Sequence, residues 1–335
     1  MEYHDPVYGF HRIEDPLLLD IMNSAAMQRL RYVLQHGISG LLGVTRPTTR
    51  FEHSVGTMLL VRRLGADLAE QAAALLHDVS HTAFSHVVDY VFGGHDSQGF
   101  HDLHKAEYVA ETDLPEILAK HGYDWRWLIR EDEFSLLEQP APALCADRLD
   151  YFLRDAQDLG LVEADQIRWV LSHLAVHSGR IAANDLTVAQ WLAYTYIEAD
   201  EASWANFREV GLYELTARAI RRALDLGALS QQDLWGTDEQ LWQLLQGVPD
   251  PELQRQLTLI HPDTGFIWDD DRPVFRISTK LRTVDPDVIV NGQLKPLSTL
   301  DQAFARFRSD YLRSKSGKWP MRIVAPDAAA SQHSP

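Results

Sequence analysis

The feature that most constrains the fold is a helical spacing of apolar residues through most of residues 15–260. Segments 17–35, 55–79 and 186–227 place apolar side chains three and four positions apart, as in helices that bury one face. Segment 36–50 is rich in glycine, threonine and proline, which is typical of a loop or short hairpin. This part of the chain therefore predicts a bundle of helices.

The pattern changes after about residue 260. Segments 273–278 and 283–290 alternate or carry β-branched residues, as strands do, and a helix is expected at 301–315 before a last strand. We therefore expect a mainly α fold with a small α+β C-terminal portion. The expected division is a helical domain over 1–260, a small α+β subdomain over 261–325 and a disordered tail over 326–335, where small polar residues offer little to pack.

Composition limits the functional classes. The 335 residues carry a formal net charge of −17, which opposes strong, sequence-independent binding to nucleic acid. A local basic cluster can still attract a small anion. One cysteine, Cys145, excludes an internal disulfide. No apolar run approaches a membrane span, and the first residues lack the order of a signal peptide, so we expect a cytoplasmic protein without a membrane partner.

Three short segments carry side chains suited to chemistry: RFEHSVG at 50–56, LLHDVSHTAFSH at 75–86 and CADRLDYFLRD at 145–155. In the second, an apolar run leads directly into His77 and Asp78. On its own, a His-Asp pair could simply cap the helix, because the dipeptide is common by chance. The other two segments decide between these interpretations.

His53 precedes the pair by 24 residues, and Asp147 follows within an apolar helix. Burying a carboxylate there is costly unless it is paired or bound to a cation. Two imidazoles and two carboxylates form a mixed nitrogen and oxygen set. Such a set suits a borderline transition ion, Mn or Mg better than structural zinc.

In this order, the three segments resemble the H…HD…D signature of HD-domain phosphohydrolases. They are most similar to the branch of deoxynucleoside triphosphate triphosphohydrolases that includes the sterile-alpha-motif HD protein, and the opening DPVYGFHRIEDPLLLDIMNSAAMQRLRYVLQHG supports that branch. The similarity covers roughly residues 5–225. It implies an HD-type helical fold and one divalent cation (Mn, Mg, Fe, Co, Ni or Zn). The implied metal ligands are His53, His77, Asp78 and Asp147.

The resemblance also implies a nucleotide substrate, with dNTP cleavage to deoxynucleoside and triphosphate as the first expectation. Substrate contacts are implied at Gln35, Arg50, Arg148, Tyr151 and Asp155. Arg50, His81 and Arg148 would meet phosphate, and Tyr151 and Asp155 the sugar. From spacing alone, Arg148, Tyr151 and Asp155 share one helix face. The alternative is a surface helix with an Arg154–Asp158 pair.

Catalytic roles are implied for Asp78, His81, His86 and His104. The leaving alkoxide needs a proton, and His86 or His104 could supply it because imidazole titrates near neutrality. Each lone histidine also has a structural interpretation. His101 lies in the same loop as His104 and could replace it, and the histidine cluster leaves a second metal open.

Several departures from the family pattern bear on the substrate. His104 is followed by Lys105 where the family has a His-Glu pair, and Leu224 stands where the triphosphohydrolases hold a tyrosine. Helix 212–224 offers three arginines that could reach a polyphosphate or only face solvent. A nucleoside monophosphate phosphatase, a cyclic nucleotide phosphodiesterase and a nucleotide sensor without turnover therefore stay open. A homo-oligomer is expected from the relatives.

Residues after 260 carry no motif that assigns a function. Lys280, Arg282 and Lys295 could be substrate or effector contacts, or only solvated charge.

Overall fold

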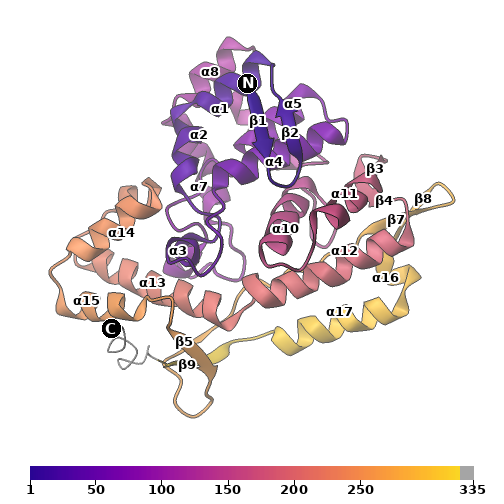
Figure 1. Cartoon of the computed structure of the whole chain (residues 1–335). Coiled ribbons are helices and arrows are strands. Elements are labelled where there is room, and N and C mark those ends of the chain that lie inside the picture. Colours follow the sequence, from indigo (N-terminus) through magenta and orange to yellow (C-terminus); the bar gives the residue numbers. More distant parts are fainter. Residues whose placement is uncertain (325–335) are drawn as a thin grey trace, which may run out of the picture.

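The structure is a computed structural model that describes residues 1–324, and helices dominate it (Figure 1). The mainly α fold with few strands is therefore confirmed. The α-helices are α1 (Pro16–Asn23), α2 (Ala25–Arg29), α3 (Gly37–Leu41), α4 (Arg50–Arg63), α5 (Leu68–Leu76), α6 (Val87–Val91), α7 (Phe100–Ala110), α8 (Leu114–Lys120), α9 (Trp125–Leu128), α10 (Ala146–Asp158), α11 (Ala164–Ser172), α12 (Leu186–Ala199), α13 (Phe207–Asp225), α14 (Asp238–Gly247), α15 (Pro251–Leu259), α16 (Leu297–Leu300) and α17 (Gln302–Lys315). The expected tail at 326–335 lies outside the described residues. No helix within residues 1–324 has the length and apolar character needed to cross a membrane.

The strands form three small sheets. They are β1 (Glu2–Asp5), β2 (Gly9–Arg12), β3 (Leu174–His177), β4 (Arg180–Ala183), β5 (Gly265–Trp268), β6 (Phe275–Ile277), β7 (Asp287–Val290), β8 (Gln293–Pro296) and β9 (Trp319–Val324). The orders are β1-β2, β3-β4-β7-β8 and β5-β9-β6. All pairings are antiparallel except β4 with β7, where Ala182 lies opposite Asp287.

Helix α4 shows how local sequence sets the element boundaries. Thr49 and Glu52 form a capping box at its start, in which each side chain accepts from the other residue's backbone N–H. Gly65, at φ 90°, follows the helix, and the Asp67 side chain caps α5. Segment 55–79, predicted as one continuous pattern, is therefore two helices joined by a tight turn.

The long helical pattern over 186–227 is also broken in the structure. Helix α12 ends at Ala199, a π-helical turn covers Asp200–Trp204, and α13 begins after the Asn206 cap. Asp200 is buried there and accepts hydrogen bonds from Arg282 N and Tyr311 Oη. Apolar spacing continues through the break, so the sequence pattern conceals it.

The residues after 260 pack into the same cores as the helices. Strands β7 and β8 extend the sheet of β3 and β4, and α17 runs beside α12 (Figure 1). Val284 and Phe304 belong to the main core with α4, α5 and α10, and Phe275 and Met321 belong to the second core with α13. Strands β5 to β9 all follow the boundary expected at residue 260, and the residues on both sides of it share their cores.

Candidate metal centre and substrate cavity

Four side chains from three separate segments converge at the centre of the helical part. His53 lies on α4, His77 and Asp78 directly follow α5, and Asp147 lies in the first turn of α10. The Nε2 atoms of His53 and His77 are 3.1 Å apart, and Asp147 Oδ1 lies 3.0 Å from the first and 3.4 Å from the second. Asp78 Oδ2 is 3.5 Å from His53 Nε2, and Asp78 Oδ1 is 3.6 Å from His77 Nε2. The structure therefore brings together all four predicted ligands.

The hydrogen bonds of the two imidazoles determine which nitrogen can bind a cation. His53 Nδ1 lies 2.7 Å from Asp150 Oδ2, and His77 Nδ1 lies 2.8 Å from the Ala74 carbonyl oxygen. An ionised carboxylate and a carbonyl only accept, so each Nδ1 carries the proton and donates. With both rings neutral, as metal binding requires, each directs an Nε2 lone pair into the same space. Such an arrangement is repulsive unless a positive charge lies between the rings.

The electrostatics also favour an added cation. Burial opposes a charge on His77, but Asp78 and Asp147 outweigh it and raise the pKa of His77 to about 10. Burial opposes ionisation of Asp147 too, yet hydrogen bonds from His53 and His77 hold the pKa of Asp147 well below its usual range. The donor set fits a divalent cation. When bound, such an ion polarises a phosphoryl oxygen and lowers the pKa of its water.

Asp150 and Arg154 support this group from behind, and neither was among the predicted site residues. Arg154 Nε lies 2.7 Å from Asp150 Oδ2, and Arg154 Nη2 lies 2.7 Å from Asp5 Oδ2 in the N-terminal hairpin. The surface pair of Arg154 with Asp158, considered as an alternative, is not formed; Asp158 pairs with Arg46 instead. The i, i+3, i+7 spacing of Asp147, Asp150 and Arg154 was the available signal.

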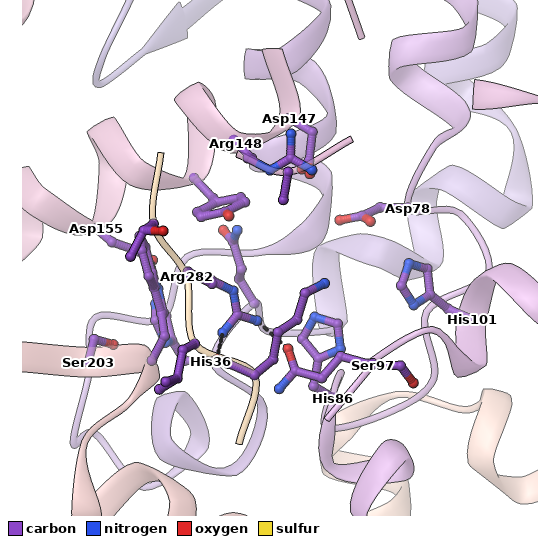
Figure 2. Close-up of a pocket in the computed structure, with 18 of the residues that line it drawn as sticks. His36, Asp78, His86, Ser97, His101, Asp147, Arg148, Asp155, Ser203 and Arg282 are labelled. Carbon is purple, nitrogen blue, oxygen red and sulfur yellow. Dashed lines mark hydrogen bonds and ion pairs between the residues drawn. The ribbon is translucent and has the colours of Figure 1, made fainter. Parts of the chain in front are cut away.

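The candidate metal group opens into a cavity of about 610 Å³. Figure 2 shows Asp147 and Asp78 on one side, Asp155 on the other, and Arg282 between Asp155 and Asp78. The cavity thus connects the metal group with the expected sugar-binding face of α10.

Asp155 is buried and already has two partners. Its Oδ1 lies 3.0 Å from His36 Nε2, and its Oδ2 accepts from Trp204 Nε1 at 2.7 Å. A carboxylate has about four lone-pair sites, so Asp155 can still accept from a hydroxyl group. His36 and Trp204 also line the cavity, and sequence reasoning missed both. His36 adjoins the predicted Gln35, whereas nothing in the sequence marks Trp204.

Two more predicted substrate contacts line the same wall. The Gln35 Oε1 atom is buried without a hydrogen-bond partner in the described residues. Tyr151 packs edge to face on Trp204 at 5.0 Å and pairs its hydroxyl with that of Tyr196. An orphaned amide oxygen costs free energy unless a ligand or water donates to it, so Gln35 offers an acceptor to a substrate.

Arg50 and Arg148 line the cavity, but both guanidinium groups have protein partners. Arg50 Nη1 lies 2.6 Å from Asp78 Oδ2, which holds this candidate ligand in place. Arg148 donates to Glu138 Oε1 at 2.8 Å and to the Gln139 carbonyl at 2.6 Å. The Arg148 guanidinium, expected to meet phosphate, is therefore largely engaged by the loop before α10.

Three histidines form a second group beside Asp78. His81 and His101 stack at 3.8 Å between ring centroids, and His86 meets His81 edge to face at 5.0 Å. Their ligand atoms lie within 4.8 Å of one another, so this group could also hold a cation. Burial is the main cause that lowers the pKa of His81 and of His86 well below the usual value, and lowers that of His101 to about 4.

The structure places His104 outside this group. Its ring packs against Phe100 and Trp235, and its Nδ1 lies 3.0 Å from Glu107 Oε2. His101 takes the cavity position expected for His104, because the first turn of α7 directs residue 101 inward. In this segment the cavity is therefore lined by His101 and not by His104, and a catalytic role for either residue stays a prediction.

Some of the other candidate cations line the cavity, and the rest lie outside it. Lys280, Arg282 and Arg308 line the cavity, whereas Lys295 is exposed on β8 and does not. The arginines of helix 212–224 also lie outside it. Arg218 and Arg221 pair with Glu214, and Arg222 pairs with Asp250.

Comparison with known proteins shows the family to which this chain belongs. The family model described as HD domain matches residues 50–155, the stretch that contains all four candidate ligands. The chain belongs to the HD-domain metal-dependent phosphohydrolases. Its activity is therefore metal-dependent hydrolysis of phosphoesters, with a divalent metal as cofactor.

The chain is 38% identical over 321 residues to the metal-dependent phosphohydrolase cns2 of Cordyceps militaris, covering 93% of this chain and 92% of that protein. It is 37% identical to YdhJ of Bacillus subtilis, covering 95% and 98%. The deoxynucleoside triphosphate triphosphohydrolase SAMHD1 of Bos taurus is 29% identical over 209 residues, covering 47% of this chain and 35% of SAMHD1. A phosphohydrolase structure from Bacteroides thetaiotaomicron shares the fold, with a TM-score of 0.67, 19% identity and coverage of 97% and 99%.

Proposed function

We propose that the protein hydrolyses a deoxynucleoside triphosphate to the deoxynucleoside and triphosphate, with His53, His77, Asp78 and Asp147 as metal ligands. One observation carries the proposal: a single cavity is lined by three of the four candidate ligands, His77, Asp78 and Asp147, and by the Tyr151–Asp155 face of α10. A phosphoester can thus meet the metal group while its sugar meets the helix.

The spacing along α10 supports a nucleotide in particular. Asp147 and Asp155 lie on the same helix, with their Cα atoms roughly 12 Å apart along its axis. Side chains that reach inward from both ends leave room for a 5′-phosphate and its sugar. In this arrangement Asp155 accepts from a sugar hydroxyl, Tyr151 packs against the ring, and Gln35 accepts from a sugar or base donor. The partial similarity to the triphosphohydrolase SAMHD1 agrees with this choice.

Each cavity histidine has a defined place in proton transfer. His86 Nδ1 lies 3.0 Å from Asp89 Oδ2, so its Nε2 is the nitrogen left for substrate. His101 and His81 lie beside it and, as neutral imidazoles, can relay a proton toward the leaving alkoxide. Arg50 contributes mainly by orienting Asp78 and by its charge.

A nucleoside monophosphate phosphatase is the second candidate, and one observation favours it. Arg50 and Arg148, the arginines beside the metal group, are both ion-paired within the protein. Fewer open cations at this point suit a single phosphate better than a chain of three.

A hydrolysis screen tests the proposal. Purified protein is assayed with Mn, Mg, Co or Ni against the four dNTPs, the NTPs and the monophosphates. Asp78→Ala serves as the blank, and Asp165→Ala, at an exposed site on α11, serves as the matched control. Triphosphate and deoxynucleoside released from a dNTP, and lost in the blank alone, support the proposal. Orthophosphate released only from monophosphates would select the second candidate.

We also propose a homo-oligomer and a cytoplasmic location. Light scattering on the purified protein tests the assembly, and a single monomeric mass at working concentrations would contradict it.

A further inference from the structure

A segment without regular secondary structure, residues 278–286, connects β6 to β7 and passes along the cavity. We call it the strap. Lys280 and Arg282 are two residues apart in this extended segment, which directs both side chains to the same side. Both line the cavity, and Figure 2 shows Arg282 in its middle.

The strap is fixed to the helical part on both sides of these two residues. Before them, the Tyr90 hydroxyl donates to Thr279 Oγ1 at 3.1 Å. At Arg282, the backbone N–H donates to Asp200 Oδ2 at 2.9 Å, and Val284 is fully buried. The backbone that carries the two cations is therefore already fixed. Binding a ligand then costs little additional backbone conformational entropy.

These cations have only neutral partners. Within residues 1–324, neither Lys280 nor Arg282 nor Arg308 forms an ion pair, although the chain carries a net charge of −17. Arg282 donates to the amide oxygen of Gln98 and to the Lys280 carbonyl, and Arg308 Nε donates to Thr283 Oγ1 at 2.9 Å. Three positive charges at one wall of a cavity, none of them in a salt bridge within residues 1–324, favour an anionic ligand.

We propose that Lys280 and Arg282, supported by Arg308, bind the outer phosphates of a polyphosphate substrate and so select for its length. This inference rests on the proposed function, in which the metal group binds the scissile phosphate and α10 binds the sugar. A single phosphate at the metal group leaves the strap cations without a partner, whereas a triphosphate supplies two more anionic groups. Arginine can grip such oxygens as a fork and lysine as a point charge.

The first test measures binding of inorganic tripolyphosphate and of orthophosphate to metal-stripped protein in EDTA, by calorimetry. Lys280→Met and Arg282→Gln are compared with Lys295→Met and Arg276→Gln, exposed residues of the same C-terminal part outside the cavity. Loss of one charge-assisted contact should weaken tripolyphosphate binding about 10-fold. The control variants should change tripolyphosphate binding less than about twofold.

Tripolyphosphate binding no tighter than that of orthophosphate would overturn the inference, as would equal binding by the strap variants and the controls. Lys280 is solvent-accessible, so Lys280→Met keeps the test valid if Arg282→Gln lowers stability. The hydrolysis assay separates the two proposals. Tripolyphosphate binding through the strap without dNTP turnover contradicts the proposed function alone. Turnover of dNTPs with an unchanged KM in both strap variants contradicts only the proposed role of the strap cations.

Discussion

His53 Nδ1 lies 2.7 Å from Asp150 Oδ2, and both side chains are buried. The carboxylate fixes the ring orientation and keeps the proton on Nδ1, so Nε2 faces His77 and Asp147. Arg154 binds the same carboxylate and continues to Asp5 in the first strand. The candidate metal group is thus tied to the N-terminal hairpin through three buried charges.

Asp150→Asn should weaken divalent metal binding about 10- to 100-fold, because the imidazole loses the carboxylate that orients it and increases its basicity. Competition titration with Mn²⁺ below the unfolding temperature measures the affinity. Asp165→Asn, at an exposed position on α11, is the matched control and should bind metal as the unmodified protein does. Equal affinity in Asp150→Asn would show that the pair has no part in holding His53.

His101→Ala should lower kcat about 100-fold, because a positioned imidazole contributes on that order to proton transfer. His104→Ala should leave kcat within about twofold, since His104 lies against Phe100 and Trp235 outside the cavity. Steady-state kinetics on the substrate found in the screen compares the two. A larger loss in His104→Ala would restore the assignment made from the sequence.

The sequence allowed prediction of the element types better than of their breaks. Helical spacing identified the bundle, and the alternating segments marked β6, β7 and β9 correctly. It did not reveal β3 and β4, although Ser178 and Gly179 between them, at φ 51° and 72°, form a hairpin turn. The break at Asp200–Trp204 stayed hidden because apolar spacing continues through it, while Asp200 itself accepts a hydrogen bond from Arg282 N, 82 residues away.

The residues of the candidate site likewise include some that the sequence located and some that it did not. Residues within the three short segments could be located, because the family pattern fixes their order and spacing. The strap cations could be named but not placed, since only the packing of residues 278–286 along the cavity shows their role. His104 and His101 are three residues apart, and helix rotation at α7 decided between them. Long-range packing is what single-sequence patterns leave out.

The buried carboxylate of Asp238 predicts a contribution to stability that depends on pH. It is buried and accepts from Phe84 N at 2.8 Å and Leu34 N at 2.9 Å. Burial raises the pKa of Asp238 from 3.8 to about 6, against the effect of these hydrogen bonds. The folded state therefore holds this proton more tightly than the unfolded state, and its stabilising effect is lost as pH rises from 3.8 through 6.

The unfolding free energy of the unmodified protein minus that of Asp238→Asn should fall by about 3 kcal/mol over this range, at about 1.4 kcal/mol for each pH unit between the two pKa values. Urea unfolding at several pH values gives both quantities. A difference that stays constant or rises with pH would show that the pKa of Asp238 is not raised in the folded state.

Gly56 sets how closely α4 approaches α10. A Cβ atom there would lie 1.8 Å from Arg154 Nη2 and 2.1 Å from Asp150 Oδ1. Gly56→Ala should therefore destabilise the fold by about 1–3 kcal/mol through overpacking. It should also weaken metal binding, because the displaced carboxylate is the one that orients His53. Gly247→Ala, where nothing lies within 4 Å, is the control and should retain stability and affinity. Denaturant unfolding and Mn²⁺ titration measure the two effects, and a stable Gly56→Ala with unchanged affinity would mean that α10 can shift without disturbing the site.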